Sequence, residues 1–379
     1  MPSKSSRRPP AAQELQGAVP RVRRGHGRST LADVAAAAGV TKVTVSRFLR
    51  EPTRVAPDTA ARIRAALAEH AYVPNKQAGM LASGRSKVVA AIVPTLANSV
   101  FAETVQGLSE GLQEVGFELL LASSGYSQER EEEQIRAVLG WSPDALAVTG
   151  RHHTPAARAL LRAAVAAGTP IIEMWDRQSR GAEFVQVGFD HAEVGRAMAR
   201  HLLGAGFFQL VYVDTSVAAD FRAHERGNAF LAAAKAAGAG VVASVITAPQ
   251  GDPFDAGRAA LLSVLMQVTP ARKPRQKQRP TLAIAFANDH LACGAWLEAQ
   301  ARGFAVPGDV ALMGFGDFAL ARQLAGGITT VQPPRYEIGR ETAATMLRLM
   351  GAAPGAVPQG HPTDKVPWRL IERGSTARG

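Results

Sequence analysis

The pattern of apolar and polar positions divides this chain into three parts. Residues 1–28 are rich in Pro, Arg, Ser and Gly and show almost no apolar periodicity, which is typical of a disordered tail. Residues 30–50 and 57–69 carry apolar side chains at helical spacing. From residue 87 onward, short apolar runs alternate with helical stretches, which is typical of parallel sheets covered by helices on both faces.

Residues 30–50, TLADVAAAAGVTKVTVSRFLR, predict two short helices separated by a turn. Thr30 is expected to cap the first helix, with Asp33 as its reciprocal partner. Gly39 supplies the turn, because a side chain there would resist a positive φ. Thr41 is expected to cap the second helix.

The second helix has an apolar back and a polar front. Val45, Phe48 and Leu49 fall on the buried side. The front carries Lys42, Thr44, Ser46, Arg47 and Arg50. A third helix over 57–69, with Pro57 at its first position, completes a small domain. The front suits the major groove of DNA; an ordinary helical hairpin with a solvated charged face is the alternative.

The remainder predicts a succession of buried strands and helices. The runs of strand length are Val88–Val93, Glu118–Ala122, Ala145–Val148, Pro170–Ile172, Val185–Val187, Leu210–Val213, Val241–Ile246, Leu282–Ala287 and Val310–Gly314. Examples of the intervening helical stretches are 101–115, 155–167, 191–203, 222–237, 290–302 and 335–350. This length exceeds one sheet, so two similar lobes are expected, with a ligand cleft between them at the carboxyl ends of the strands.

Composition adds a partner class and a compartment. The chain has 379 residues and a net charge of +11, and its basic excess lies in residues 1–28 and 271–280, which favours a polyanionic partner. The single cysteine, Cys293, excludes an intramolecular disulfide and fits a reducing cytoplasm. The chain has neither an apolar run of about 18 residues nor a secretory signal, so we expect a cytoplasmic protein without a membrane span.

No pattern of catalytic chemistry is present. The sequence lacks a phosphate-binding loop motif, a glycine-rich dinucleotide fingerprint and the ligand spacing of a zinc site. The pair His152 and His153 alone is too little for a metal site, and nothing pairs the isolated Ser, His and Asp residues as a triad. We therefore expect a protein that is not an enzyme and that needs no cofactor.

Residues 30–86 resemble the DNA-binding headpiece of the lactose-repressor family of bacterial regulators. The matching residues are Leu31, Asp33, Val34, Ala35, Gly39, Val40, Thr44, Val45, Ser46, Arg47, Val55, Thr59, Ile63, Tyr72, Pro74, Asn75, Ala78 and Leu81. The resemblance continues to about residue 370. The phrases GVTKVTVSRFLR, SVFAETVQGL, IIEMWD, VGFD and AFANDHLACGA are most similar to the gluconate-operon repressor branch.

The resemblance implies an α/β fold with an added helical headpiece. A helix-turn-helix headpiece over 29–74 and a hinge helix with its linker over 75–86 precede a core like the periplasmic sugar-binding proteins over 87–370. The chain is expected to cross between two lobes of parallel sheets three times. The first lobe is placed at about 87–187 and 315–330, and the second at about 188–314 and 331–370. A flexible end is expected over 371–379, and a polar, basic loop over 268–281.

The resemblance also implies the DNA contacts. Lys42, Val43 and Arg47 occupy the positions that meet base edges. Arg47 is expected to bond guanine O6 and N7, and Val43 to contact a thymine methyl group.

The hydroxyl-bearing residues of the same helix are assigned to the DNA backbone. Thr41, Thr44 and Ser46 are expected to bind phosphate oxygens, which position the helix without reading sequence. They therefore add affinity for any duplex rather than selectivity.

The hinge helix matches residues 75–83, NKQAGMLAS, and begins with Asn75, a further expected DNA contact. It is too short to be stable alone, and Gly79 weakens it by about 1 kcal/mol relative to alanine. We expect it to be disordered off DNA and helical on it. Leu81 falls where relatives insert an apolar wedge into the minor groove; packing in a dimer contact is the alternative role.

The effector site is expected at the ends of the core strands. The residues placed there by the resemblance are Asn98, Phe101, Thr149, Arg151, Glu173, Asp176, His224, Asn288, Asp289 and Arg335. A sugar acid needs a cation for its carboxylate; Arg335 is the first candidate and Arg151 the second. Glu173, Asp176 and Asp289 are candidate hydroxyl partners. Each of these residues has an alternative as an ordinary salt-bridge residue.

Two positions depart from the family pattern. Many relatives carry an arginine where His224 stands, and an acidic residue where Gly316 stands, with the acid here one position later at Asp317. Both departures argue against a neutral-sugar site. They leave the ligand open between gluconate, a related aldonate and a phosphorylated sugar acid.

These expectations combine into a ligand-switched repressor of sugar-acid catabolism genes. A homodimer is expected to bind a pseudo-palindromic operator and to leave it when a gluconate-type effector binds. The first alternative is a cytoplasmic sugar-binding receptor without a DNA role. The second is an enzyme with a fused DNA-binding segment.

Overall fold

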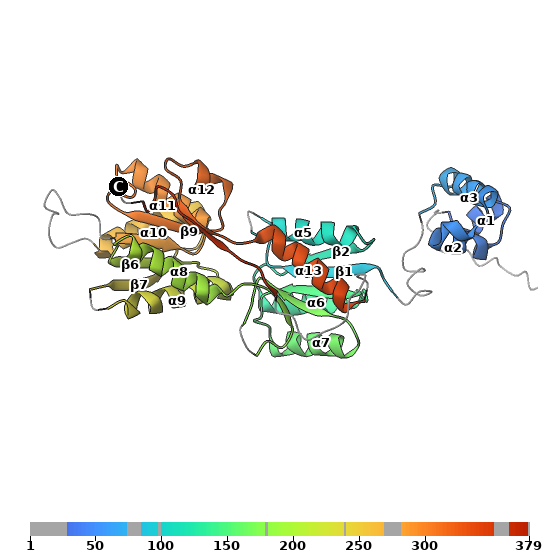
Figure 1. The fold of residues 1–379 in the computed structure, drawn as a ribbon, viewed down its shortest axis with the longest axis horizontal. Helices are drawn as coiled ribbons and strands as arrows, with labels where there is room; N and C mark the ends of the chain where they lie inside the picture. Colours follow the sequence, from blue (N-terminus) through green and yellow to red (C-terminus); the bar gives the residue numbers. More distant parts are fainter. Residues whose placement is uncertain are drawn as a thin grey trace, which may run out of the picture. The chain divides into compact units, whose positions relative to one another are not determined.

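The computed structural model describes residues 29–73, 85–97, 100–178, 181–238, 240–268, 282–351 and 364–377. The chain forms two compact units, Met1–Ala82 and Ser83–Gly379, whose elements are labelled in Figure 1. The expectations for the tail 1–28 and for most of the hinge and of the basic segment 268–281 lie outside the described residues. None of the helices in the described ranges is long and apolar enough to cross a bilayer.

The first unit contains the predicted three helices. They are α1 (Leu31–Ala37), α2 (Lys42–Arg50) and α3 (Pro57–Glu69), with a short 3-10 helix, η1 (Pro52–Arg54), before the third. Apolar residues of all three helices pack into one core, with Val34, Val45 and Ile63 fully buried. Burial of one face of each short helix stabilises what none of them would form alone.

Local signals place the helix ends as predicted. Thr30 and Asp33 form a capping box, in which the Thr30 N–H donates to Asp33 at 2.7 Å. Gly39 has a φ of +63° and makes the turn between the first two helices. The Thr41 hydroxyl accepts the Thr44 N–H at 3.2 Å and so caps α2.

The first lobe of the second unit is a six-stranded sheet with helices on both faces. Its strand order is β11-β5-β4-β3-β1-β2, and the described pairs are parallel. The strands are β1 (Val88–Val93), β2 (Glu118–Ser123), β3 (Ala145–Thr149), β4 (Ile171–Met174), β5 (Val185–Gly188) and β11 (Asp364–Lys365). The helices are α5 (Phe101–Gln113), α6 (Gln128–Leu139), α7 (Pro155–Ala166) and α13 (Arg335–Leu349).

Alternation along these strands divides the core between two layers. Ala90 and Ile92 of β1 pack with residues of α6 and α7, whereas Val89 and Ala91 belong to the cluster that contains α5 and α13. Burial on both faces explains why the strands read as continuous apolar runs.

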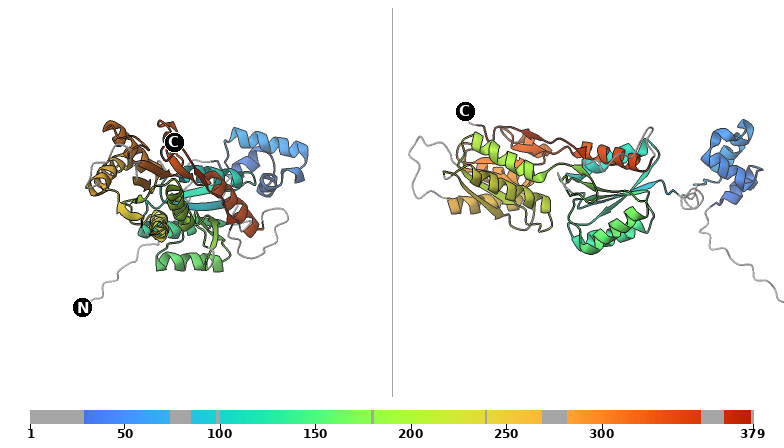
Figure 2. Two further views of the ribbon diagram at one scale, coloured as in Figure 1. Left: turned by 60° about the vertical axis from the view of Figure 1, so that its left-hand side comes forward. Right: turned by 60° about the horizontal axis from the view of Figure 1, so that its bottom comes forward.

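The second lobe repeats this design. Its strand order is β12-β10-β9-β8-β6-β7, in which only the β10–β12 pair among the described strands is antiparallel. The strands are β6 (Gln209–Asp214), β7 (Val242–Thr247), β8 (Leu282–Phe286), β9 (Ala311–Phe315), β10 (Thr329–Gln332) and β12 (Arg369–Ile371). The helices are α8 (His191–Gly204), α9 (Phe221–Ala236), α10 (Pro253–Val268), α11 (Asp289–Ala301) and α12 (Ala319–Gln323). The sheet and helix layers of both lobes are visible in Figure 2.

The chain crosses between the lobes three times, but the later crossings lie elsewhere than the sequence predicted. Residues 315–330 were expected in the first lobe, yet β10 pairs with β9 in the sheet of the second. Residues 331–370 were expected in the second lobe, yet α13 packs along α5 of the first lobe (Figure 1) and β11 joins its sheet. The strand β10 reads TTVQ, which is too short and polar to be recognised as a buried strand.

The expectation of a flexible end over 371–379 is wrong for residues 371–377. Ser375 and Thr376 are buried, and the Ser375 hydroxyl donates to the Leu312 carbonyl at 2.6 Å. It also accepts the Thr329 N–H at 2.8 Å. These bonds attach the C-terminal segment to β9 and β10, so it closes the second lobe.

Glycines let the helices α10 and α11 approach closely. A Cβ added to Gly294 would overlap the carbonyl oxygen of Phe254, a backbone atom that cannot move aside as a side chain does. We expect Gly294→Ala to lower the free energy of unfolding by about 1–3 kcal/mol, since overpacking forces backbone shifts. Thermal unfolding of the full chain measures this.

The matched control for that substitution is Gly204→Ala at the end of α8. A Cβ on Gly204 meets nothing within 4 Å, so we expect a neutral or stabilising effect of up to about 1 kcal/mol. Equal melting temperatures for the two variants would contradict the close helix contact.

Candidate nucleic-acid interface and interlobe site

The polar front of α2 is not packed against the other described helices of the first unit. Lys42, Val43 and Arg47 are exposed, and Val43 leaves 65% of its surface in water. An exposed valine between cationic side chains gives this face both apolar and charged contacts for a groove. The hydroxyls of Thr41 and Thr44 lie 2.9 Å apart and bond each other, and Ser46 is half-buried.

Three of the predicted site residues, Asn75, Leu81 and Asn98, lie outside the described residues. The other predicted effector residues all belong to the second unit. Most of them follow the carboxyl end of a strand, as the sequence predicted, but they are divided among separate polar networks.

One small cavity is lined by residues of both lobes. It measures about 40 Å³, room for a few water molecules at most. Its lining is Pro94, Ser124, Tyr126, Ser127, Gln128, Glu131, Thr149, Gly150 and His152 from the first lobe and Ala219, Phe221 and Arg222 from the second. Among the predicted effector residues that the structure describes, only Thr149 lines it directly, and its hydroxyl donates to the Ile92 carbonyl at 3.0 Å.

Arg151 lies beside the cavity and connects the lobes. Its Nη1 contacts Oδ1 of Asp176 at 2.9 Å within the first lobe. Its Nη2 contacts Oε1 of Glu225, on α9 of the second lobe, at 3.1 Å. Burial raises the pKa of Asp176 to about 6, although the charges of Arg222 and Arg151 oppose that shift. The structure therefore brings into contact Arg151 and Asp176, two residues that the sequence analysis expected at the effector site.

Arg222 is the cation of the cavity wall. Its side chain is buried, its Cζ lies 5.6 Å from the centroid of the Phe101 ring, and it forms no ion pair with a carboxylate in the described part of the chain. Gly150, at a φ of +91°, leaves room for it, because a Cβ there would lie 2.6 Å from the guanidinium Nη1. An arginine in this position is suited to an anionic ligand.

A second guanidinium, one helical turn further along α9, sits at the first crossing between the lobes. Arg226 donates to the His191 Nδ1 at 3.0 Å and to the Ala287 carbonyl at 2.9 Å, and its Cζ lies 3.8 Å from the centroid of the Phe315 ring. Burial and the nearby positive charge of Arg226 lower the pKa of His191 well below its usual value. The neutral form of His191 is therefore favoured, and Arg226 brings a positive charge to the crossing.

Arg335, the first candidate for binding a carboxylate, already has partners. Its Nη2 contacts Oε1 of Glu103 at 2.9 Å, and its Nη1 donates to the Gly316 carbonyl. The guanidinium Cζ lies 5.7 Å from the centroid of the Phe318 ring. Because Glu103 compensates its charge, Arg335 is a weaker candidate than Arg222.

Two of the predicted hydroxyl partners are occupied within their own lobes. Glu173 accepts from the Gln186 amide at 2.6 Å and lies 3.3 Å from the His153 Nε2. Asp289 accepts from the Thr330 hydroxyl at 2.6 Å and from the Phe318 N–H at 2.8 Å. Because these hydrogen bonds occupy both carboxylates, neither is free for a ligand. Burial also raises the pKa of Asp289 to about 6.

His224 and Asn288 also have local roles. The His224 Nδ1 lies 2.7 Å from Asp214 Oδ2, and its Nε2 lies 3.1 Å from the Ala218 carbonyl. Burial alone lowers the pKa of His224, but the bond to Asp214 raises it overall. Asn288 caps α11 by accepting the Leu291 N–H at 3.1 Å.

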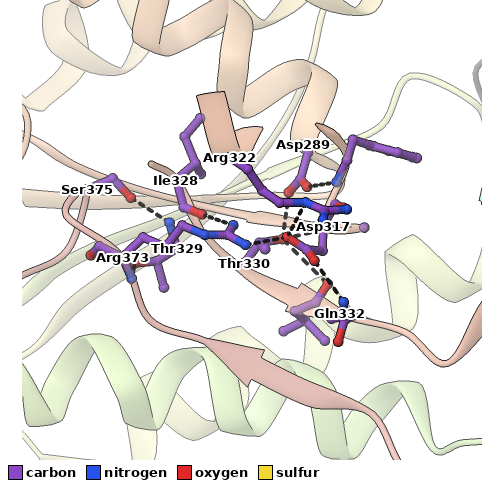
Figure 3. A network of polar contacts seen from close by, with 12 residues as sticks. Asp289, Asp317, Arg322, Ile328, Thr329, Thr330, Gln332, Arg373 and Ser375 are labelled. Atoms are coloured by element: carbon purple, nitrogen blue, oxygen red, sulfur yellow. Dashed lines mark hydrogen bonds and ion pairs between the residues drawn. The ribbon is translucent and has the colours of Figure 1, made fainter. Parts of the chain in front are cut away.

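The displaced acid Asp317 points into the second lobe (Figure 3). Its carboxylate contacts Arg373 at 2.5 Å and accepts from the Gln332 amide at 2.8 Å. Arg322 donates to its backbone carbonyl at 3.1 Å. Asp317 therefore attaches the C-terminal segment, and it leaves no uncompensated negative charge for a ligand anion to meet.

A buried cluster of Glu131, His153 and Glu173 lies behind the cavity and predicts a pH effect. Burial alone lowers the pKa of His153, but the bonds to Glu131 (2.9 Å) and Glu173 raise it to about 9. A raised pKa means that this stabilisation is complete below pH 6.5 and is lost as the pH rises through 9. We expect the deficit in melting temperature of His153→Gln to shrink over that interval.

The control for this pH effect is His290→Gln. Burial lowers the pKa of His290, the opposite direction to that of His153, so its charged form is disfavoured over the interval. The change in melting temperature that His290→Gln causes is expected to be the same at pH 6.5 and pH 9.5. A His153→Gln deficit that does not change with pH would contradict the charged cluster.

Several residues of the cavity were not predicted as site residues. Ser124, Tyr126 and Ser127 directly follow β2, so the rule that ligands meet strand ends would have found them. Arg222 and Phe221 begin α9, and no periodicity separates a cavity-lining helix start from a solvated one. Glu225 gave no signal in the sequence, because its partner Arg151 belongs to the other lobe.

Comparisons with known proteins match both units. Residues 30–75 match the model of bacterial regulatory proteins of the lacI family, and residues 199–376 match a periplasmic binding protein-like domain. The chain is 36% identical over 324 residues to the HTH-type transcriptional regulator GntR of Pseudomonas aeruginosa, covering 86% of this chain and 90% of that protein. It is 31% identical to the regulator of the same name from Escherichia coli, covering 86% and 93%.

Solved structures give the same result. A LacI-family transcriptional regulator from Silicibacter pomeroyi superposes with a TM-score of 0.80 at 30% identity, covering 92% of this chain and all of that one. The transcription regulator GntR from Chromobacterium violaceum gives 0.65 at 30% identity, covering 76% and 99%. The lac repressor dimer bound to operator shares the fold, with a TM-score of 0.76 at 20% identity over 93% of this chain.

Proposed function

The chain belongs to the lacI family of bacterial regulatory proteins, and on this premise we propose that it represses genes of sugar-acid catabolism and leaves its operator when a gluconate-type acid binds between its lobes. The family is not enzymatic, and its members bind DNA. The proposal concerns the effector, the direction of its action and the residues involved.

The single observation that carries the effector class is the charge of the cavity wall. Arg222 lines the cavity, is 9% exposed and has no carboxylate partner among the described residues. A buried cation without an ion pair is costly; the charge of Arg222 acts on Asp176 nearby, but a ligand carboxylate would compensate it directly with charge-assisted hydrogen bonds. The curated relatives named GntR support an acid of the gluconate type.

The proposed effector contacts follow from this arrangement. Arg222 binds the carboxylate, Thr149 and Tyr126 offer hydroxyls, and Phe101 supports the guanidinium. Arg151 and Asp176 flank the same wall. Glu173, His224, Asn288 and Asp289 are left out, because their polar atoms are occupied elsewhere.

The cavity is too small for a six-carbon acid at its present volume of about 40 Å³. Entry of the ligand therefore moves the lobes relative to each other. We propose that a cytoplasmic homodimer couples this motion to two headpieces on a pseudo-palindromic operator, with Lys42, Val43 and Arg47 at base edges and Thr41, Thr44 and Ser46 at phosphates. A coupling free energy of about 1–3 kcal/mol is sufficient.

The experiment is a calorimetric titration of the full chain with D-gluconate, a second aldonate, 6-phosphogluconate and the neutral analogue D-glucitol. Gel shifts with and without each compound then measure operator binding. Binding of an acid, together with release of DNA, supports the proposal. Operator binding that is indifferent to every sugar acid would remove the switch.

A further inference from the structure

Glu225 binds Arg151 in the way a ligand carboxylate would. The Arg151 Nη1 contacts Glu225 Oε2 at 3.2 Å, and the Nη2 contacts Oε1 and Oε2 at 3.1 and 3.2 Å. This is a bidentate contact between a guanidinium and both oxygens of a carboxylate. It joins the end of β3 in the first lobe to α9 in the second.

The two acids on Arg151 are not equivalent. Asp176 is fully buried, and its Oδ2 has no hydrogen-bond partner among the described residues. Its pairing with Arg151 is therefore part of the first-lobe interior. Glu225 keeps 29% of its side chain exposed, so water can hydrate it once it leaves Arg151. Glu225 is the partner that can be exchanged.

The exchangeable pair lies at the proposed effector site. Arg222, which lines the cavity, is on the same helix three residues before Glu225, and Gly150, which leaves room for it, directly precedes Arg151. The ring of His152, the residue after Arg151, lies with its centroid 4.5 Å from that of Phe221 across the lobes. A ligand entering between Arg222 and Arg151 therefore meets the Glu225 carboxylate first.

We propose that Glu225 is a specificity-determining residue, an internal carboxylate that occupies the anion position on Arg151 until an acidic effector replaces it. This proposal rests on the proposed function, because it assumes an acidic ligand at this wall. A carboxylate ligand that displaces Glu225 takes its place in compensating the positive charge of Arg151. A neutral sugar that displaced Glu225 would leave the Arg151 guanidinium without this negative partner, so the site rejects it.

The test is calorimetry on the full chain with Glu225→Gln, which keeps the shape and removes the charge. We expect gluconate to bind this variant about tenfold more tightly than the native chain. The reason is that residue 225 occupies Arg151 in a smaller fraction of the variant molecules, so less free energy is spent in displacing it. D-glucitol is expected to bind no better. The matched control is Glu298→Gln, which removes an acid paired with Arg258 and Arg302 on the same lobe.

A double variant separates competition from a general change of charge. In the background Arg151→Gln, the Glu225→Gln substitution is expected to give no further gain in gluconate affinity. A gain that persists there overturns the proposal. So does weaker gluconate binding to Glu225→Gln, which would make Glu225 a direct ligand contact or a closing latch.

Failure of the proposed effector is distinguishable from failure of this inference. If neither the native chain nor the variant binds any aldonate, the proposed function is wrong, and sulfate serves as the anion probe. A larger rise in melting temperature with sulfate for Glu225→Gln than for the native chain and Glu298→Gln supports the internal carboxylate. Equal rises overturn it.

Discussion

Arg47→Ala is expected to lower the preference of this protein for its operator over random duplex DNA by roughly tenfold to hundredfold. Arg47 is exposed on the front of α2, and its planar fork can bond both acceptors of a guanine. Losing one such contact costs about 1–3 kcal/mol of discrimination, or roughly a tenfold to hundredfold loss of selectivity. The operator is first selected from a random library, and gel shifts at fixed salt then measure both affinities.

The control is Arg62→Ala on α3, which removes the same charge from the same unit. Any weakening there is expected to apply equally to operator and random DNA, because contacts to phosphates carry no sequence information. If Arg47→Ala kept the full ratio of operator to random affinity, α2 would not read bases through this residue.

The headpiece was predictable because its signals are local. The capping box of Thr30 and Asp33, the left-handed turn at Gly39 and the cap at Thr41 each act within four residues. Such signals survive in a single sequence, since the physics that fixes a helix end involves only its neighbours.

The lobes were predictable in kind but not in their final connections. Continuous apolar strands, such as β1 and β8, are recognisable because burial on both faces requires them. The strand β10 is polar and short, and its place beside β9 depends on hydrogen bonds to a distant segment, such as those of Thr329 with Ser375 and Arg373. No periodicity records a partner 44 or 46 residues away, so the crossings were misplaced.

The residues of the site were also predictable where the signal is local and not predictable where it depends on a distant partner. The rule that polar residues gather at strand ends singled out Thr149, which lines the cavity, and Arg151 and Asp176, which pair with each other. It could not tell which charges are already compensated. Arg335 is paired with Glu103, and Glu173 with His153, whereas Arg222 stands without a carboxylate among the described residues.

The largest expected effect on effector binding is that of Arg222→Met, which removes the cation of the cavity wall and keeps much of its length. Without it, a ligand carboxylate would be taken out of water beside Thr149 and Phe101 with only Arg151 as a counter-charge, and Arg151 is shared with Asp176. Losing one partner of such a pair costs about 2–5 kcal/mol, so we expect gluconate affinity to fall by at least roughly thirtyfold. Calorimetry on the full chain measures the loss.

Operator binding provides the readout that separates this effect from misfolding. Arg222→Met is expected to bind operator as the native chain does without ligand, but to remain bound at gluconate concentrations that release the native chain. Arg302→Met, which removes an exposed cation paired with Glu298 on the same lobe, is expected to respond normally. If Arg222→Met kept its gluconate affinity within about threefold, a difference below 1 kcal/mol, the carboxylate would belong to Arg151 or Arg335, and the cavity wall would need another explanation for its unpaired charge.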